Sequence, residues 1–134
     1  MFTPRNQKFQ KQQKGKSIKK VLVSNKIFNF GSYSLRSVSF GRISSKEIEA
    51  MYNSINKIIK KTGRIVVSVH AHTPVSRKPI EVRMGKGKGA VSFFSSKIRS
   101  GMILCSIDCS NKALALSALK SAQLRLSIKT KIIC

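Results

Sequence analysis

No acidic side chain occurs between Met1 and Lys46, although that stretch contains eleven lysines and arginines. Over all 134 residues, 27 basic side chains stand against 4 acidic ones, which gives a formal net charge of +23. Repulsion among so many like charges destabilises a compact free chain. Packing the same side chains around phosphates instead releases condensed counterions and gives strong, salt-sensitive binding. The charge therefore predicts a permanent polyanionic partner.

The length of 134 residues suits a single domain, and an apolar content of 41% is enough for a modest core. Basic residues recur along the whole chain, which is typical of a protein largely embedded in nucleic acid. No apolar run approaches the roughly 20 residues that a membrane-spanning helix needs. We therefore expect nucleic acid as the partner, and neither a membrane nor a second copy of the chain.

The three cysteines do not predict a metal site. Their odd number in a chain without an apolar secretory signal indicates reduced thiols that act as small buried hydrophobes. Cys105 and Cys109 lack a second pair, and no carboxylate or thiol neighbours His70 and His72 on the strand expected there. Because tetrahedral zinc needs four ligands, we predict no metal and no cofactor.

Residues 1–20 are rich in lysine and glutamine, hold few aliphatic side chains and show no period that could bury one face. We expect them to form an extended basic arm, followed by a single domain over residues 21–134. Phe2 and Phe9 are the exceptions in the arm. They either stack on nucleic-acid bases or dock on the protein's own core, and both interpretations stay open.

The clearest predicted element is a helix that begins at Ser44. Ser44 and Glu47 fit a capping box, an apolar stripe follows at helical spacing, and Gly63 suits a left-handed stop. Strands are expected over 21–30, 33–40 (after Gly31-Ser32), 64–70, 80–84, 90–94 and 102–107, and a second helix over 111–126. The stretch between the strands expected at 64–70 and 80–84, which contains Pro74 and Pro79, is expected to form a loop. This mixture predicts an α+β fold, with two helices packed on a mainly antiparallel sheet.

Residues 84–89 (MGKGKG) are the most chemically specific stretch. Alternating glycines let a backbone approach a ligand closely, and the lysines add phosphate-directed charge. We expect this loop at the tip of a long hairpin. A dinucleotide-binding motif would need a helix to start here, and a P-loop would need Gly-Lys-Ser or Gly-Lys-Thr, so both are rejected. A solvated hairpin tip without function remains an alternative.

Catalysis has little support in the sequence. The four acidic residues are scattered, and no histidine stands in a pattern with serine or cysteine that indicates a nucleophile and its base. We therefore predict that the chain is not an enzyme. A free RNA-binding or chaperone module is the main alternative to a structural RNA-binding protein, and an RNA-modifying or nucleotide-dependent enzyme is a weaker one.

Several segments, taken in order, resemble one family of ribosomal proteins. They are residues 30–36 (FGSYSLR), 41–43 (GRI), 48–50 (IEA), 63–65 (GRI), 78–89 (KPIEVRMGKGKG) and 126–130 (LSIKT). Together with the basic arm, they make the chain similar to the universal L-sixteen family of large-subunit ribosomal proteins, in its bacterial or organellar form. The resemblance runs from about Arg5 to Lys131, and residues 78–89 carry most of it.

The resemblance implies an α/β-hammerhead-like α+β fold bound to large-subunit rRNA, among neighbouring ribosomal proteins and beside aminoacyl-site tRNA. It also implies that the arm and the glycine-lysine hairpin point toward the peptidyl transferase centre, where the RNA carries out catalysis. The rRNA-binding residues implied are Arg5, Lys8, Lys11, Lys14, Lys16, Arg36, Arg42, Lys78, Arg83, Lys86 and Lys88. The loop implied to lie near the tRNA comprises Arg83, Met84, Gly85, Lys86, Gly87, Lys88 and Gly89.

The chain departs from the family pattern at several positions. Gln10 stands where arginine is common, Tyr52 where arginine is usual and Ser127 where proline is usual, and the second helix has lost its customary acids. The family's basic arm explains the acid-free N-terminus better than a mitochondrial transit peptide does. Lysine outnumbers arginine, and serine and isoleucine are abundant, which indicates an AT-rich coding sequence. We therefore expect a protein of the mitochondrial ribosome, with a plastid or the bacterial cytoplasm as alternatives.

Overall fold

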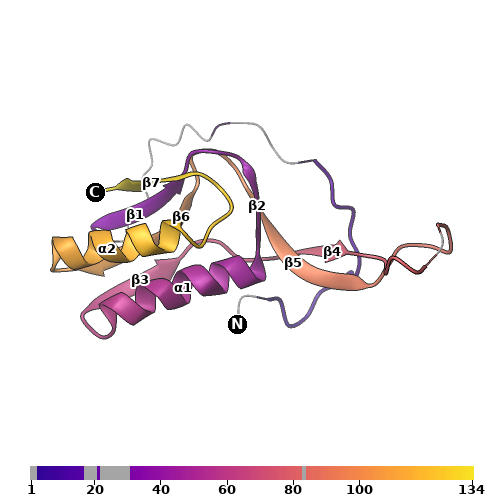
Figure 1. Cartoon of the computed structure of the whole chain (residues 1–134), viewed down its shortest axis with the longest axis horizontal. Coiled ribbons are helices and arrows are strands. Elements are labelled where there is room, and N and C mark those ends of the chain that lie inside the picture. Colours follow the sequence, from indigo (N-terminus) through magenta and orange to yellow (C-terminus); the bar gives the residue numbers. More distant parts are fainter. Residues whose placement is uncertain (1–2, 17–20, 22–30, 83) are drawn as a thin grey trace.

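The computed structural model describes residues 3–16, 21, 31–82 and 84–134. Within these ranges the chain forms two helices and seven strands (Figure 1). In chain order they are β1 (Tyr33–Ser37), β2 (Gly41–Ser44), α1 (Ser45–Ile59), β3 (Gly63–Val67), β4 (Thr73–Ser76), β5 (Val91–Ile98), β6 (Ile103–Cys109), α2 (Lys112–Gln123) and β7 (Thr130–Ile133).

The strands form two open sheets. One has four strands in the order β3-β6-β1-β7, and the other has three in the order β2-β5-β4. Every pairing is antiparallel. In Figure 1 the four-stranded sheet and both helices form the body of the molecule, while β4 and β5 extend away from it as a long hairpin. The predicted α+β class, with two helices and an antiparallel sheet arrangement, is confirmed.

The core lies between the two helices and the four-stranded sheet, which they cover from one side (Figure 1). The sheet contributes Leu35, Cys105 and Ile107, all fully buried. The helices contribute Ile48, Met51, Ile55, Ile59, Ala115, Ala118, Leu119 and Ala122. The alanines of α2 let its axis come close to α1, because interhelical distance depends on side-chain size. Each buried leucine or isoleucine stabilises the fold by about 1.5–3 kcal/mol.

Helix α1 begins as predicted but ends differently. The Ser44 N–H donates to Glu47 Oε2 at 2.8 Å and the Glu47 N–H donates to Ser44 Oγ at 3.3 Å, so the capping box is present. The left-handed residue at the C-terminus is Lys60, with φ +53°, and not Gly63. Gly63 opens β3 instead. A Cβ there would lie 2.6 Å from the carbonyl oxygen of Asp108, so close strand approach explains this glycine.

The predicted strand over 80–84 is wrong. Ile80 and Met84 are 94% and 100% exposed, and none of the described residues of this segment, 80–82 and 84, belongs to a strand. The partner of β5 is β4, which lies in the stretch predicted as a loop. Pro74 fits there because β4 is an edge strand, where a missing N–H donor is tolerated. Alternation of apolar and charged residues therefore gave a false signal where no neighbouring strand was available.

Other expectations differ in detail. Strand β3 ends at Val67, so His70 and His72 lie exposed in a connection and not on a strand. Strand β5 continues beyond the predicted residue 94 to Ile98, while β2 and β7 were not predicted. The strand expected over 21–30 lies outside the described residues except for Val21.

The cysteines behave largely as small hydrophobic residues. Cys105 and Cys109 are buried free thiols, whereas Cys134 is exposed. Burial raises the pKa of the Cys105 thiol to about 12, so it stays protonated and unreactive near neutral pH. The described residues contain no cluster of three or more metal-ligating side chains. None of the helices in the described ranges has the length and apolarity to cross a bilayer.

Candidate nucleic-acid interface

The glycine-lysine loop connects β4 to β5 at the far end of the hairpin (Figure 1). The Arg77 N–H donates to the Ala90 carbonyl at 3.1 Å and closes the base of the loop. Gly85 and Gly87 have φ of +102° and +81°, and a Cβ on either would meet nothing within 4 Å. Backbone conformation therefore explains these two glycines. The loop connects two antiparallel strands, and the strand that precedes it is β4.

Gly89 has a different reason to be glycine. A Cβ at this position would lie 2.7 Å from the carbonyl oxygen of Arg77, at the closed base of the loop. Lys86, between the two left-handed glycines, itself adopts φ +53° and is exposed. The Lys78 ammonium donates to the Gly85 carbonyl and folds the loop back on its own start. The loop thus has a defined base and a tip that presents Lys86 to solvent.

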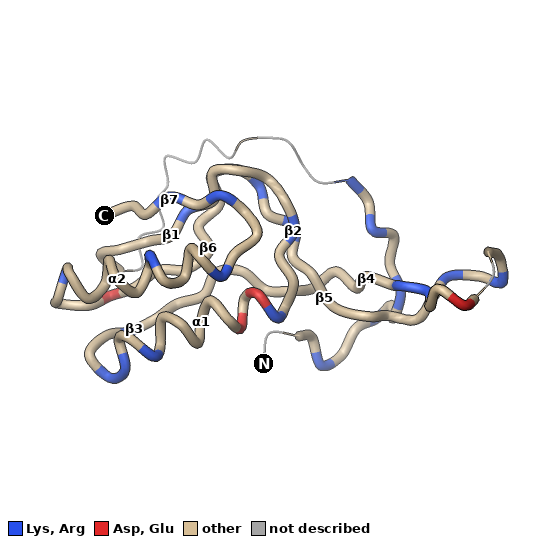
Figure 2. The backbone as a smooth tube through the Cα atoms, viewed as in Figure 1, with Lys and Arg blue, Asp and Glu red and all other residues tan. Residues whose placement is uncertain are grey.

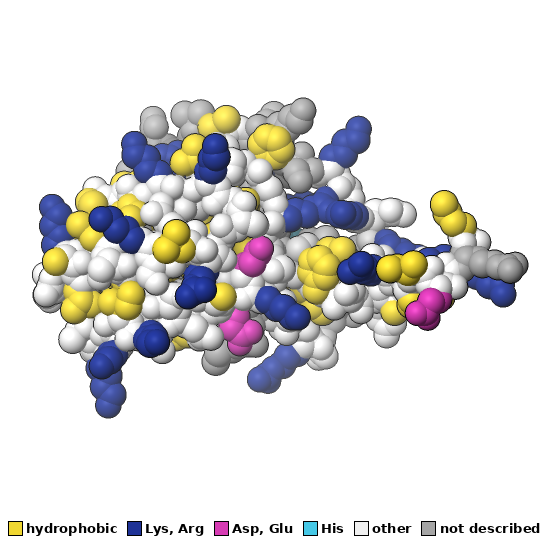
Figure 3. Space-filling view, viewed as in Figure 1, with side chains coloured by type: hydrophobic (Ala, Val, Ile, Leu, Met, Phe, Trp, Pro, Cys, Tyr) yellow, Lys and Arg dark blue, Asp and Glu magenta, His cyan; other side chains and the backbone are white. Residues whose placement is uncertain are grey.

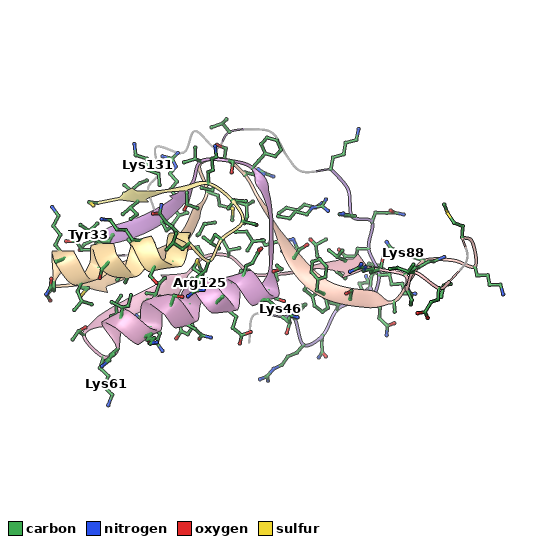
Figure 4. The ribbon with its side chains drawn as sticks, in the orientation of Figure 1. Tyr33, Lys46, Lys61, Lys88, Arg125 and Lys131 are labelled. Carbon is green, nitrogen blue, oxygen red and sulfur yellow. The ribbon has the colours of Figure 1, made fainter. Side chains whose placement is uncertain are left out.

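The N-terminal arm lies against this hairpin and is attached through backbone carbonyls. Gln7 Nε2 donates to the His72 carbonyl at 2.8 Å, and Lys11 Nζ donates to the Lys88 carbonyl at 3.0 Å. Lys88 Nζ returns a hydrogen bond to the carbonyl of Gln12. Figure 4 shows Lys88 at the junction of the hairpin and the crossing arm. A pair of lysines, each held by the other segment's backbone, thus fixes the crossing point.

Arg42 on β2 forms a second attachment. Its Nη2 donates to the carbonyls of Lys14 and Gly15, at 2.7 Å to Lys14. The arm borders one cavity with Phe94 through residues 4–7, Gln10 and Lys11, and a second cavity with Phe93 through Lys14. The arm is therefore in contact with the three-stranded sheet at two separate places.

The structure brings only some of the predicted site residues together. Lys11 and Lys88 meet where the arm crosses the hairpin, and Arg42 reaches the arm separately at the Lys14 carbonyl. Arg36 lies in the body on β1, where its Nε donates to the Gly101 carbonyl at 2.9 Å. Arg5, Lys8 and Lys16 are exposed along the arm, with the Lys8 ammonium 5.7 Å from the ring centroid of its neighbour Phe9. Arg83 lies outside the described residues.

Positive charge is not confined to this region. Figure 2 shows lysine and arginine on the helices, the sheets, the arm and the hairpin, with few acidic positions between them. Helix α1 and the turn after it carry Lys46, Lys57, Lys60 and Lys61, and α2 carries Lys112 and Lys120. In Figure 3 basic side chains stand out from both the body and the hairpin. The distribution fits a protein surrounded by polyanion on several sides.

Comparison with known proteins decides the family. The family model of ribosomal protein L16p/L10e matches residues 4–133. The large ribosomal subunit protein uL16 of Orientia tsutsugamushi (strain Boryong) is 38% identical over 99% of this chain and 97% of its own length. The corresponding proteins of Erythrobacter litoralis and Maricaulis maris are also 38% identical over 99% of the chain, and over 92% and 96% of their own lengths. The chain belongs to the L16p/L10e family.

Membership in the L16p/L10e family makes this chain a structural ribosomal protein of the large subunit and not an enzyme. The match begins at residue 4 and ends at residue 133, so it includes the arm, the hairpin and the body. The predicted family resemblance is confirmed. The relatives named here are bacterial, and the similarity gives no support to the mitochondrion as compartment.

Sequence reasoning missed two features of the L16p/L10e interface region. Ile80, Val82 and Met84 were expected on a buried strand face, yet they are exposed on the loop. Figure 3 shows apolar side chains along the hairpin and at its far end, interspersed with basic ones. Phe93, 39% exposed, lines a cavity between the arm and β2. An adjacent Phe-Phe pair on an expected strand was the available signal, because one ring of such a pair must face away from the core.

Proposed function

We propose that this chain binds large-subunit rRNA through its arm and hairpin, and that its glycine-lysine loop lies beside the peptidyl transferase centre, where it helps position aminoacyl-tRNA. The rRNA-binding residues proposed are Arg5, Lys8, Lys11, Lys14, Lys16, Arg36, Arg42, Lys78, Arg83, Lys86 and Lys88. The tRNA-proximal loop proposed is Arg83 to Gly89. Neighbouring large-subunit proteins complete the set of partners, and the chain takes part as a monomer.

One observation supports this proposal above the others. Where the arm meets the hairpin, Lys11, Lys88 and Arg42 donate to backbone carbonyls and not to carboxylates. Such contacts orient the cations but leave their full charge uncompensated. The acid nearest in sequence to the loop lysines is Glu81, against Lys78, Lys86 and Lys88. Oriented, unneutralised cations on two crossing segments are suited to a phosphate backbone.

The division into an arm over 1–20 and a single domain over 21–134 is part of the same proposal. Residues 3–16 contain no helix or strand and reach the rest of the chain through hydrogen bonds to His72, Lys88 and Arg42. Residues 31–134, apart from Arg83, contain both helices and all seven strands seen in the described chain. The arm adds charge and reach, and the domain supplies the stable support.

A competition experiment distinguishes this function from that of a free RNA chaperone. Labelled large-subunit rRNA fragments bound to the full chain are challenged with unlabelled random RNA at several salt concentrations. We expect random RNA to displace the rRNA fragments poorly, because shape and arm contacts add to the charge term. Equal displacement by random RNA and by rRNA would favour the chaperone function.

The proposed role of the loop near tRNA is tested with Lys86→Gln, which removes the charge and keeps a polar, flexible side chain at an exposed position. We expect unfolding to be unchanged, the salt slope of rRNA binding to fall by about 0.9, and ribosomes carrying the variant to accommodate tRNA more slowly. Lys57→Gln on the exposed face of α1 is the matched control. Normal tRNA accommodation with Lys86→Gln would remove the role proposed for the loop.

The compartment is a separate proposal that composition alone supports. We propose the mitochondrial ribosome because lysine, serine and isoleucine are abundant in a chain whose basic arm falls within the family match. A plastid or the bacterial cytoplasm, the two alternatives, is compatible with the same role in the large ribosomal subunit. Fractionation of organelles, followed by detection of the chain in matrix ribosomes, tests this point without affecting the rRNA proposal.

A further inference from the structure

We propose that the cavity between the arm and the three-stranded sheet, named here the Phe93 pocket, binds one unpaired RNA nucleotide. Its base would lie against the Phe93 ring, and its phosphate among Lys14, Arg42 and Lys46, all of which line the cavity. The inference rests on the proposed RNA-binding function and adds a site with a defined chemistry to it.

Strand register assembles one wall of the Phe93 pocket. Arg42 pairs with Lys97, Ser44 with Ser95, and Val75 with Phe93. Residues directly opposite each other in an antiparallel pair share a face, and alternate residues along a strand share it too. One face of β2, β5 and β4 therefore carries an aromatic ring, hydroxyl groups and cations in a continuous row.

Phe93 differs from the phenylalanine beside it. Phe94 packs against the hydrophobic core, whereas Phe93 is 39% exposed and lines the cavity. An aromatic ring in a concave, cationic setting offers a flat π-face on which a base can stack. An aliphatic side chain of similar size would fill the wall equally well, but it would lack that face.

Three cations reach the Phe93 pocket from different elements: Lys14 from the arm, Arg42 from β2 and Lys46 from the first turn of α1. Figure 4 shows Lys46 at the start of α1, close to β2 and β5. The Arg42 Nη2 is engaged by arm carbonyls, while its Nε is buried without a hydrogen-bond partner in the described structure. A phosphate oxygen is a suitable acceptor for guanidinium and ammonium donors.

The pocket also contains one carboxylate, that of Glu47. Its Oε2 accepts the Ser44 N–H at 2.8 Å, so it serves the helix cap. Three positive charges against one negative charge leave the cavity cationic. Ser44 and Ser95 also line the cavity, but their hydroxyl groups are engaged within the protein: Ser44 Oγ accepts the Glu47 N–H, and the buried Ser95 Oγ donates to the Thr73 carbonyl. The ring and the cations therefore carry the proposed recognition.

The chemistry favours a single-stranded nucleotide over a duplex. Bases in an A-form duplex are stacked on each other, so a phenyl ring in a recessed cavity reaches only a base that is splayed out. Duplex RNA can contact the cations through its phosphates, but it gains nothing from the ring. Phe93 should therefore matter for single strands alone.

The test measures binding of the full chain to two fluorescein-labelled probes by anisotropy. The probes are a mixed-sequence single-stranded RNA of about 12 nucleotides and a duplex RNA of the same length. The variants are Phe93→Leu, which loses the π-face but keeps apolar volume, and Phe93→Tyr, which keeps the ring. Phe40→Leu is the matched control, because Phe40 is 44% exposed and lines no cavity described here.

We expect Phe93→Leu to weaken single-strand binding about 5- to 100-fold, the range of one base–aromatic stack, and to leave duplex binding unchanged. Phe93→Tyr and Phe40→Leu should bind both probes as the wild type does. Unchanged single-strand binding by Phe93→Leu, or an equal loss for both probes, would overturn the proposal. Thermal unfolding confirms that each variant is folded.

A second readout uses the unmodified protein. Wild-type chain is photo-cross-linked to single-stranded RNA containing 4-thiouridine and digested, and the adduct is located by mass spectrometry. An adduct in the peptide that holds Phe93 supports the pocket, and adducts confined to the glycine-lysine loop and to arm residues before Lys14 contradict it. Failure of the wild type to prefer large-subunit rRNA over random RNA would instead count against the proposed function, so the two failures are distinguishable.

Discussion

The body and the arm–hairpin region of this protein are held together by different forces. In the body, α1 and α2 bury isoleucine, leucine and alanine against the four-stranded sheet. Where the arm lies against the hairpin and β2, long polar side chains donate hydrogen bonds to backbone carbonyls. Apolar burial specifies the body without a partner, whereas cations on carbonyls leave charge that only a polyanion can neutralise.

The largest loss of stability is expected when a cavity is opened in the core of the body. Ile55, fully buried on α1, should cost about 2–5 kcal/mol of unfolding free energy when changed to alanine. Urea denaturation measures this loss. Ile80→Ala, at a position 94% exposed on the loop, is the control and should change stability by less than about 0.5 kcal/mol. Equal effects of the two changes would contradict the assignment of the core.

The next largest effect on stability is expected from the titration of the Cys105 thiol in the body. The folded-state pKa of Cys105 is raised to about 12 by burial, so the unfolded chain loses this proton at a lower pH than the folded one. Stability should therefore fall as pH rises above about 9, by about 1.4 kcal/mol at pH 10. The stability–pH slope of wild type and Cys105→Ala is compared by urea denaturation. The variant should lack this component, and identical slopes would show that the thiol is not buried.

The smallest effect on stability is expected in the arm–hairpin region. Arg42→Gln removes the donors to the Lys14 and Gly15 carbonyls, and since Arg42 is half-buried it should cost no more than about 1 kcal/mol of unfolding free energy. Hydrogen exchange of the arm amides should nonetheless become faster. Lys57→Gln, on the exposed face of α1, should change neither quantity. Unchanged arm exchange in Arg42→Gln would show that this attachment does not hold the arm.

The difference between the two regions also explains what sequence could predict. Helix α1 was predicted from Ser44 onward because its capping box and apolar stripe are local signals that its packing reinforces. Residues 80–84 alternate just as convincingly, but a strand also needs a partner, and β5 pairs with β4 instead. Partner choice is a property of the whole sheet, so local alternation could not reveal it.

The site was predictable to the same degree. Charge and glycine spacing selected the arm and the loop, and the structure joins them by two contacts, Lys11 with Lys88 and Arg42 with Lys14. Sequence alone did not indicate that Arg36 lies apart from Arg42. The two residues are on β1 and β2, and their spacing does not reveal that these strands belong to different sheets. The Phe93 pocket arises from strand register and from the path of the arm, neither of which spacing alone encodes.

The central claim is that large-subunit rRNA neutralises the excess positive charge of this chain. Its most direct test is sedimentation of lysates in a sucrose gradient at moderate salt, with the chain followed by immunodetection. We predict that the chain is recovered with large-subunit particles and is absent from the top of the gradient. Recovery as a free protein at the top, with intact large subunits that lack it, would contradict the account.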